Sequence, residues 1–291
     1  IVHGDKQVVK MKELSKLPSP GPFASHLPGL FEPTGCAVVG HRGFGMNRCS
    51  GRGIRENTVA SFIAAHGSGA GWCEFDVQVT ADGIPVLWHD DVLLVRHGFE
   101  PIQSFSIREL DLSELKALSR AAIATAAAAA AGVPAAMAAA AGADSTDEFR
   151  DLKAPCSGSC GVDEDDDDDD EDNPSADIPV VFYRKFPVGY GSRRAPEPEP
   201  CVMDVEDEIP TLEELMKHAP PDLGFSMELK FDEANPCATP RLVAELRAIL
   251  AVCRAHPTRR ILFSSFDPDA ASLMRALQGL YPVMLITHCQ P

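Results

Sequence analysis

The chain has 291 residues, of which 45% are hydrophobic, and this is enough for one sizeable core. Its formal net charge is −17, but ten acidic residues form one unbroken run at 163–172, so the remainder is only mildly acidic. This balance argues against a surface that binds nucleic-acid phosphates. No run of about 18 apolar residues occurs, so the sequence predicts no membrane span.

The nine cysteines are scattered along the chain and include no CxxC pair. This pattern argues against a disulfide framework or a zinc site and is typical of reduced thiols, so we expect a cytoplasmic protein. Residues 1–35 contain several prolines and are expected to form an approach segment. Because residue 1 is isoleucine, we expect the native start to lie upstream.

The next part of the chain predicts two strands, a helix and a hairpin. Apolar residues 36–40 lead directly into the polar residues His41 and Arg42, which is typical of a buried strand with functional groups at its carboxyl end. Asn57 can cap the following helix, and residues 82–83 (Asp-Gly) predict a turn. The predicted elements are strands 36–40 and 72–80, helix 58–66 and a hairpin extension at 84–90.

The composition changes between residues 92 and 205. Residues 121–143 are almost all alanine, which favours helix but offers no large apolar face to pack. The acidic run at 163–172 repels itself and cannot be buried. We therefore expect a largely disordered, low-complexity insertion at 92–205, with short ordered pieces at 106–118 and 180–188.

Regular structure is predicted again from Thr211, which forms a capping box with Glu214. The alternation of helices with nearly continuous apolar strands favours a parallel sheet with helices outside it. Only five such strands are countable, whereas a closed (β/α)8 barrel needs eight, so residues 36–291 predict a partial barrel interrupted by the insertion. The later elements are helices 211–219, 241–255 and 269–278, and strands 224–230, 261–266 and 282–288.

Carboxylates occupy alternate positions of two predicted strands. Glu74 and Asp76 are two residues apart and so point to one face of their strand, and Glu228 precedes Lys230 in the same spacing. Buried carboxylates are costly without a cation, and three of them suit Mg²⁺ or Ca²⁺. The alternative is that they form ion pairs with Arg42 or Lys230 at the rim of the sheet.

Two histidines, His41 and His89, each follow an apolar strand and precede a loop. Histidines that flank a metal site are suited to general acid–base work on a phosphodiester, and Arg42 can hold the phosphate with its planar guanidinium. A structural role for either histidine is the alternative.

Four segments together resemble the glycerophosphodiester phosphodiesterase family, in order and with suitable spacing, and the similarity extends to its eukaryotic intracellular, glycerophosphocholine-hydrolysing branch. The resemblance covers residues 36–91 and 209–288. The segments are HRGFGMN, ENTVASFIAA, EFDVQVTADGIPVLWHD and GFSMELKFD.

The resemblance implies a TIM-type α/β barrel and a metal-dependent hydrolase that releases sn-glycerol 3-phosphate and an alcohol, with glycerophosphocholine as the favoured substrate and no nucleic-acid partner. It leaves the oligomeric state open. Asp90 is interpreted either as a supporting residue or as a structural one. Carried over position by position, it implies His41 and His89 as the acid–base pair, Arg42 and Lys230 as phosphate ligands, Glu56 as a supporting residue, and Glu74, Asp76 and Glu228 as ligands of Mg²⁺ or Ca²⁺.

Two alternatives stay open at this point. One is a phosphodiesterase of the phospholipase C-like or sphingomyelinase D-like kind, which shares the barrel and the pairing of histidines with a metal. The other is a non-catalytic remnant of the family, because the family's later strands are absent and the strand at 282–288 would present an unpaired edge.

Overall fold

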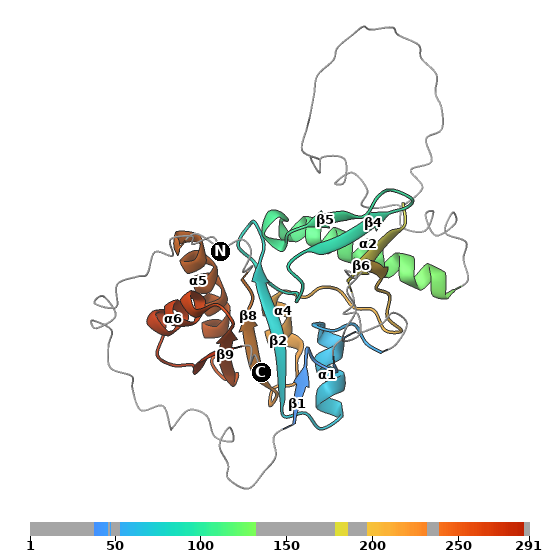
Figure 1. Ribbon diagram of the computed structural model, residues 1–291. Helices are drawn as coiled ribbons and strands as arrows, with labels where there is room; N and C mark the ends of the chain where they lie inside the picture. The colour runs from blue at the N-terminus through green and yellow to red at the C-terminus, as the bar shows by residue number, and fades with distance from the viewer. Residues whose placement is uncertain are drawn as a thin grey trace, which may run out of the picture. The chain divides into compact units, whose positions relative to one another are not determined.

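The computed structural model describes residues 38–45, 47, 53–131, 178–185, 197–231 and 239–287. These residues belong to two compact units, coloured along the chain in Figure 1. The first unit takes its residues from 38–45, 56–91, 210–231 and 239–287, and the second from 47, 53–55, 92–131, 178–185 and 197–209. The expected approach segment at 1–35 and the acidic run lie outside the described residues.

The first unit is built on a mostly parallel sheet of order β1-β2-β8-β9-β10, with β3 antiparallel to β2. The five predicted parallel strands therefore form, and they pair in chain order, as expected for a TIM-type α/β fold. Within the described residues β1 and β10 are the two ends of this sheet, and it does not close. The strands are β1 (Val39–His41), β2 (Trp72–Val79), β3 (Pro85–Leu87), β8 (Gly224–Leu229), β9 (Ile261–Ser265) and β10 (Val283–Leu285).

Four helices connect these strands, and α5 and α6 lie side by side next to β8 and β9 in Figure 1. The predicted capping box of α4 is confirmed, because the Thr211 side chain accepts from the backbone of Glu214 while the Glu214 carboxylate accepts from that of Thr211. The helices are α1 (Val59–Gly67), α4 (Leu212–His218), α5 (Thr239–Ala255) and α6 (Pro268–Leu277).

The prediction that Asn57 caps α1 is wrong. The cap is Thr58, whose hydroxyl accepts a hydrogen bond from the backbone N–H of Ser61. Asn57 has a φ of +56°, whereas a capping residue adopts an extended conformation. The Asn57 side chain is thus available for a different partner, which lies in the candidate site.

The core of the first unit lies between the sheet and its helices. Alternate residues of β2 and β8 face this core, where Phe75 and Phe225 stack edge-on at 5.6 Å between ring centroids. The intervening residues of the same strands, among them Glu74, Asp76 and Glu228, face the opposite side of the sheet. The alternation therefore separates a packed apolar face from a polar one.

The second unit has its own antiparallel sheet of order β5-β4-β6-β7, against which the helix α2 packs at β6. Residues 53–55 join this unit through a parallel bridge between Ile54 and Val205 and an ion pair between Arg55 and Glu206. The elements are β4 (Leu93–His97), β5 (Gln103–Phe105), the 3₁₀ helix η3 (Ile107–Glu109), α2 (Leu112–Ala130), β6 (Val180–Arg184) and β7 (Glu199–Pro200).

The ordered pieces expected at 106–118 and 180–188 within the insertion at 92–205 correspond to η3 with the start of α2 and, as far as the described residues reach, to β6. The start of α2 is fixed by buried leucines, and the helix continues into the alanine tract as far as Ala130. The core of the second unit combines apolar residues from three stretches of chain that are far apart in sequence. No single stretch therefore has a strong hydrophobic pattern. These residues are Leu93, Val95, Ile107, Leu110, Leu115, Leu118, Val180, Phe182, Cys201, Met203 and Ile209.

The cysteines in the described residues, Cys73, Cys201 and Cys253, are buried thiols. Burial raises the pKa of Cys73 and Cys253 to about 12, so both are protonated packing residues at neutral pH. No described helix has the length and apolar character that crossing a bilayer requires. The expected cytoplasmic location stays a prediction.

Candidate metal and phosphodiester site

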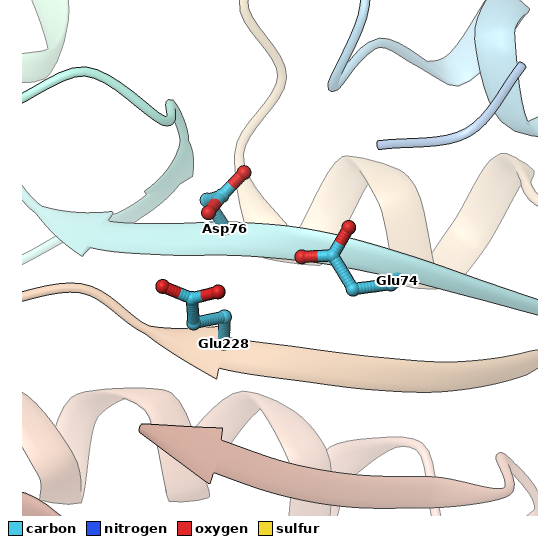
Figure 2. Close-up of side chains that lie close together, drawn as sticks. All are labelled: Glu74, Asp76 and Glu228. Carbon is cyan, nitrogen blue, oxygen red and sulfur yellow. The ribbon is translucent and has the colours of Figure 1, made fainter. Parts of the chain in front are cut away.

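Three carboxylates meet on the polar face of the sheet, two from β2 and one from near the carboxyl end of β8. The parallel register sets Asp76 directly opposite Glu228, with Glu74 two residues earlier on β2. One oxygen from each carboxylate lies within 4.8 Å of the others, and Figure 2 shows the three groups on the same side of the two strands. This spacing is about twice the 2.0–2.6 Å bond that Mg²⁺ or Ca²⁺ makes with oxygen, so one ion fits among them.

The electrostatics of this carboxylate cluster also suit a cation. Burial, and then the charge of Asp76, raise the pKa of Glu74 to about 8. The Lys230 ammonium lies 3.2 Å from Glu228 and 4.0 Å from Oδ1 of Asp76. That Oδ1 atom is buried and has no hydrogen-bond partner, so the cluster contains a buried acceptor oxygen that a cation would satisfy. The donor set fits a hard divalent cation.

Arg42 sits beside the carboxylate cluster in a turn that follows β1. Its φ is +54°, a conformation that costs free energy for a residue with a long side chain. The guanidinium is buried, with Nη1 2.8 Å from Glu56 and Nε 3.6 Å from Asp76. The backbone N–H of Arg42 donates to Glu74 at 3.0 Å. The strained turn thus directs both a cationic side chain and a backbone donor towards the carboxylates.

Helix α1 holds this turn in place. The Ser61 hydroxyl donates to the carbonyl of Arg42 at 3.2 Å and accepts from the backbone N–H of Phe44 at 2.7 Å. Gly43 has a φ of +89°, and a Cβ at that position would lie 2.3 Å from the Ser61 oxygen. Only glycine fits between Arg42 and Phe44 at this close approach.

The two candidate histidines have different surroundings. His41 ends β1 and is half-exposed, with Nε2 3.6 Å from Glu74. Burial, and then the charge of Arg42, lower the pKa of His41, and His89 contributes to the same shift. His89 follows β3, and its Nδ1 lies 2.6 Å from Oδ1 of Asp90. This contact with the Asp90 carboxylate orients the imidazole ring of His89.

Two polar residues near the site were not identified from the sequence. The Asn57 side chain donates to Oδ2 of Asp76 at 3.0 Å, which leaves Oδ1 of Asp76 as the open oxygen. The Gln78 side chain donates to the carbonyls of Trp88 and Asp90. Asn57 was interpreted only as a helix cap. Gln78 could have been found, because it continues the alternating polar positions of β2 by two more residues.

The first unit therefore holds every residue singled out from the sequence. Their catalytic and ligand roles stay predictions. These residues are His41, Arg42, Glu56, Glu74, Asp76, His89, Asp90, Glu228 and Lys230.

The family model of the Glycerophosphoryl diester phosphodiesterase family matches residues 41–290. Glycerophosphodiester phosphodiesterase GDPD2 of Arabidopsis thaliana is 29% identical over 266 residues, which cover 89% of this chain and 55% of the plant protein. Glycerophosphocholine phosphodiesterase GDE1 of Eremothecium gossypii is 26% identical over 273 residues, which cover 86% of this chain and 19% of the fungal protein.

The chain thus spans about half the length of the plant relative and a fifth of the fungal one. Among solved structures, a glycerophosphodiester phosphodiesterase from Parabacteroides distasonis is similar with a TM-score of 0.45 and 18% identity. That alignment covers 85% of this chain and 63% of the other.

Proposed function

Because this chain belongs to the Glycerophosphoryl diester phosphodiesterase family, we propose that it hydrolyses glycerophosphodiesters to sn-glycerol 3-phosphate and an alcohol. The observation that carries the proposal is the convergence of Glu74, Asp76 and Glu228 within 4.8 Å, beside Arg42. The carboxylates match a positively charged metal ion, and the guanidinium beside them matches the negatively charged phosphate of the substrate.

The carboxylate cluster would hold a divalent cation. When bound there, the cation supplies Lewis-acid stabilisation of negative charge on a phosphate oxygen. The guanidinium of Arg42 and the ammonium of Lys230 bind the remaining phosphate oxygens and orient the diester. Glu56 keeps Arg42 in place through its 2.8 Å contact with Nη1.

His41 and His89 divide the proton transfers. The lowered pKa of His41 leaves its imidazole neutral at pH 7, which suits the base that takes a proton from the attacking hydroxyl or water. His89, oriented by Asp90 through Nδ1, donates a proton to the leaving alcohol.

The oxygen-only ligand set favours Mg²⁺ or Ca²⁺ over softer metals. Glycerophosphocholine is the favoured substrate, because the fungal relative GDE1 is named a glycerophosphocholine phosphodiesterase. The partner of the site is then a small molecule.

The test is release of glycerol 3-phosphate from glycerophosphocholine by the purified chain, with Mg²⁺, with Ca²⁺ and with EDTA. We expect metal-dependent release that falls by about 10²–10⁴-fold in His41→Ala, in keeping with the loss of one acid–base group. Glu228→Gln should lose the response to metal. Glu213→Gln is the matched control, because Glu213 lies on α4 and pairs with Lys217 and His256 instead.

Release of a phosphorylated alcohol in place of glycerol 3-phosphate would favour the phospholipase C-like alternative. No release with either metal, from any glycerophosphodiester, would contradict the proposal and favour a non-catalytic role.

A further inference from the structure

Gln78 makes an unusual pair of contacts beside the candidate site. It is nearly buried at 7% exposure, near the end of β2, and its side-chain nitrogen donates to the carbonyl of Trp88 at 3.0 Å and of Asp90 at 2.8 Å. Both partners are acceptors, so the amide nitrogen rather than the oxygen faces them. One amide group therefore bridges the backbone on both sides of His89.

The bridged segment lies where the pairing of β2 and β3 ends. The two strands pair as far as Val77 with Leu87, and the backbone of Trp88 donates once more to the carbonyl of Asp76 at 3.2 Å. Beyond that point the chain turns away from the ladder. The side chain of Gln78 attaches β2 to the chain as far as Asp90, two residues beyond Trp88, and so across the segment that carries His89.

Asp90 connects the Gln78 side chain to the imidazole of His89. Its backbone carbonyl accepts from Gln78, and its carboxylate lies 2.6 Å from Nδ1 of His89. A displacement of the Asp90 backbone would therefore move the group that orients the ring.

On this basis we propose that Gln78 is a positioning residue that fixes His89 for proton transfer. The expected effect on kcat rests on the proposed function. The expected effect on the backbone around His89 rests on the contacts alone. Gln78 lies on the polar face of β2 with Glu74 and Asp76, whereas the core side of the strand is packed by Val77 and Val79. Its amide is directed at the loop of His89 and not into that core.

The variant that tests the proposal is Gln78→Met, which keeps the length of the side chain and removes both amide hydrogens without adding charge. Gln278→Met is the matched control, because Gln278 makes the same kind of bond to the carbonyl of Tyr281, at 2.9 Å, after α6. If Gln78→Met does not fold, Gln78→Asn keeps the amide but draws it back by one methylene.

We expect kcat of Gln78→Met to fall on the order of 10²-fold, the cost of misplacing a catalytic group by about 1 Å, with KM and the cation Kd within about threefold. Gln278→Met should keep the wild-type kcat. In a His89→Ala background the Gln78 substitution should have no further effect, because its role acts through His89. A kcat within twofold of wild type, or an effect that persists without His89, would overturn the proposal.

A second measurement separates this inference from the proposed function. Hydrogen exchange of the backbone amides at 88–91 should accelerate at least tenfold in Gln78→Met, with no acceleration there in the control. A wild-type protein that cleaves no glycerophosphodiester would defeat the proposed function only. Unchanged exchange at 88–91 would defeat the positioning role of Gln78, whatever the activity.

Discussion

Replacement of Glu74 by glutamine should change how the stability of the protein depends on pH, and a divalent cation should narrow the difference between the wild type and the variant. The carboxyl of Glu74 has a pKa of about 8, raised from 4.5 by burial and by Asp76. At about 1.4 kcal/mol per unit, this difference corresponds to roughly 5 kcal/mol, a free energy shared with the neighbouring Asp76. Such an amount rivals the whole stability of many domains.

The sign follows from the proton that Glu74 holds. Below pH 4.5 the carboxyl is protonated in both the folded and unfolded states, so it carries no penalty there. Between pH 4.5 and about 8 the unfolded state has lost the proton and the folded state still holds it, so the free energy of unfolding falls as the pH rises. Above pH 8 the penalty is complete. Glu74→Gln removes the charge and should remove this decline.

The assay is urea denaturation of the wild type and Glu74→Gln in EDTA at pH 5.5 and pH 8.5. We expect the variant to gain stability relative to the wild type at the higher pH. Saturating Mg²⁺ or Ca²⁺ should narrow this difference, because a cation at 100 times its Kd stabilises the wild type by about 2.7 kcal/mol and the variant by much less.

Glu213→Gln is again the control, with the opposite sign. Lys217 and then His256 lower the pKa of Glu213, so its stabilisation is present above the ordinary carboxyl pKa and is lost as the pH falls. The reasoning is refuted if the difference between the wild type and Glu74→Gln is the same at both pH values in EDTA. It is also refuted if the cation stabilises both proteins equally.

Three further predictions concern the support of the site. Asn57→Asp should raise the cation Kd by about 10–100-fold, because the amide donor to Asp76 is lost, and calorimetric titration giving the wild-type Kd would contradict this role. Gly43→Ala should cost about 1–3 kcal/mol in urea denaturation and lower kcat, since its Cβ would meet Ser61 at 2.3 Å; a fully stable, active variant would argue against the tight turn. Phe75→Ala should cost about 3–5 kcal/mol, and a loss below 1 kcal/mol would mean that the core under β2 is not packed as described.

The helices and strands of the first unit could be predicted because their signals are local. The capping box at Thr211 and the apolar strands each depend on residues close together in the chain, and the structure contains them in the expected order. The alternation of Glu74 and Asp76 on β2 was likewise enough to place both carboxylates on one face, as observed.

The second unit could be predicted only in part, for the opposite reason. Its core joins β4, α2 and β6, and β6 is separated from α2 by the alanine-rich and acidic segments. Each apolar stretch is short, and only their pairing buries enough surface to be recognised as a core. The sequence therefore indicated only short ordered pieces at 106–118 and 180–188, whereas the described residues also include β4, β5 and β7.

The sequence by itself determined the kinds of groups present and their order along the strands, because alternation and capping are properties of neighbouring residues. Tertiary structure decided which of these groups meet. The register of β2 against β8 sets Asp76 opposite Glu228, the left-handed turn at Arg42 directs its guanidinium at them, and Gln78 reaches back to both sides of His89. These contacts join residues distant in sequence, and their free energy depends on distances and burial that exist only once the sheet has formed.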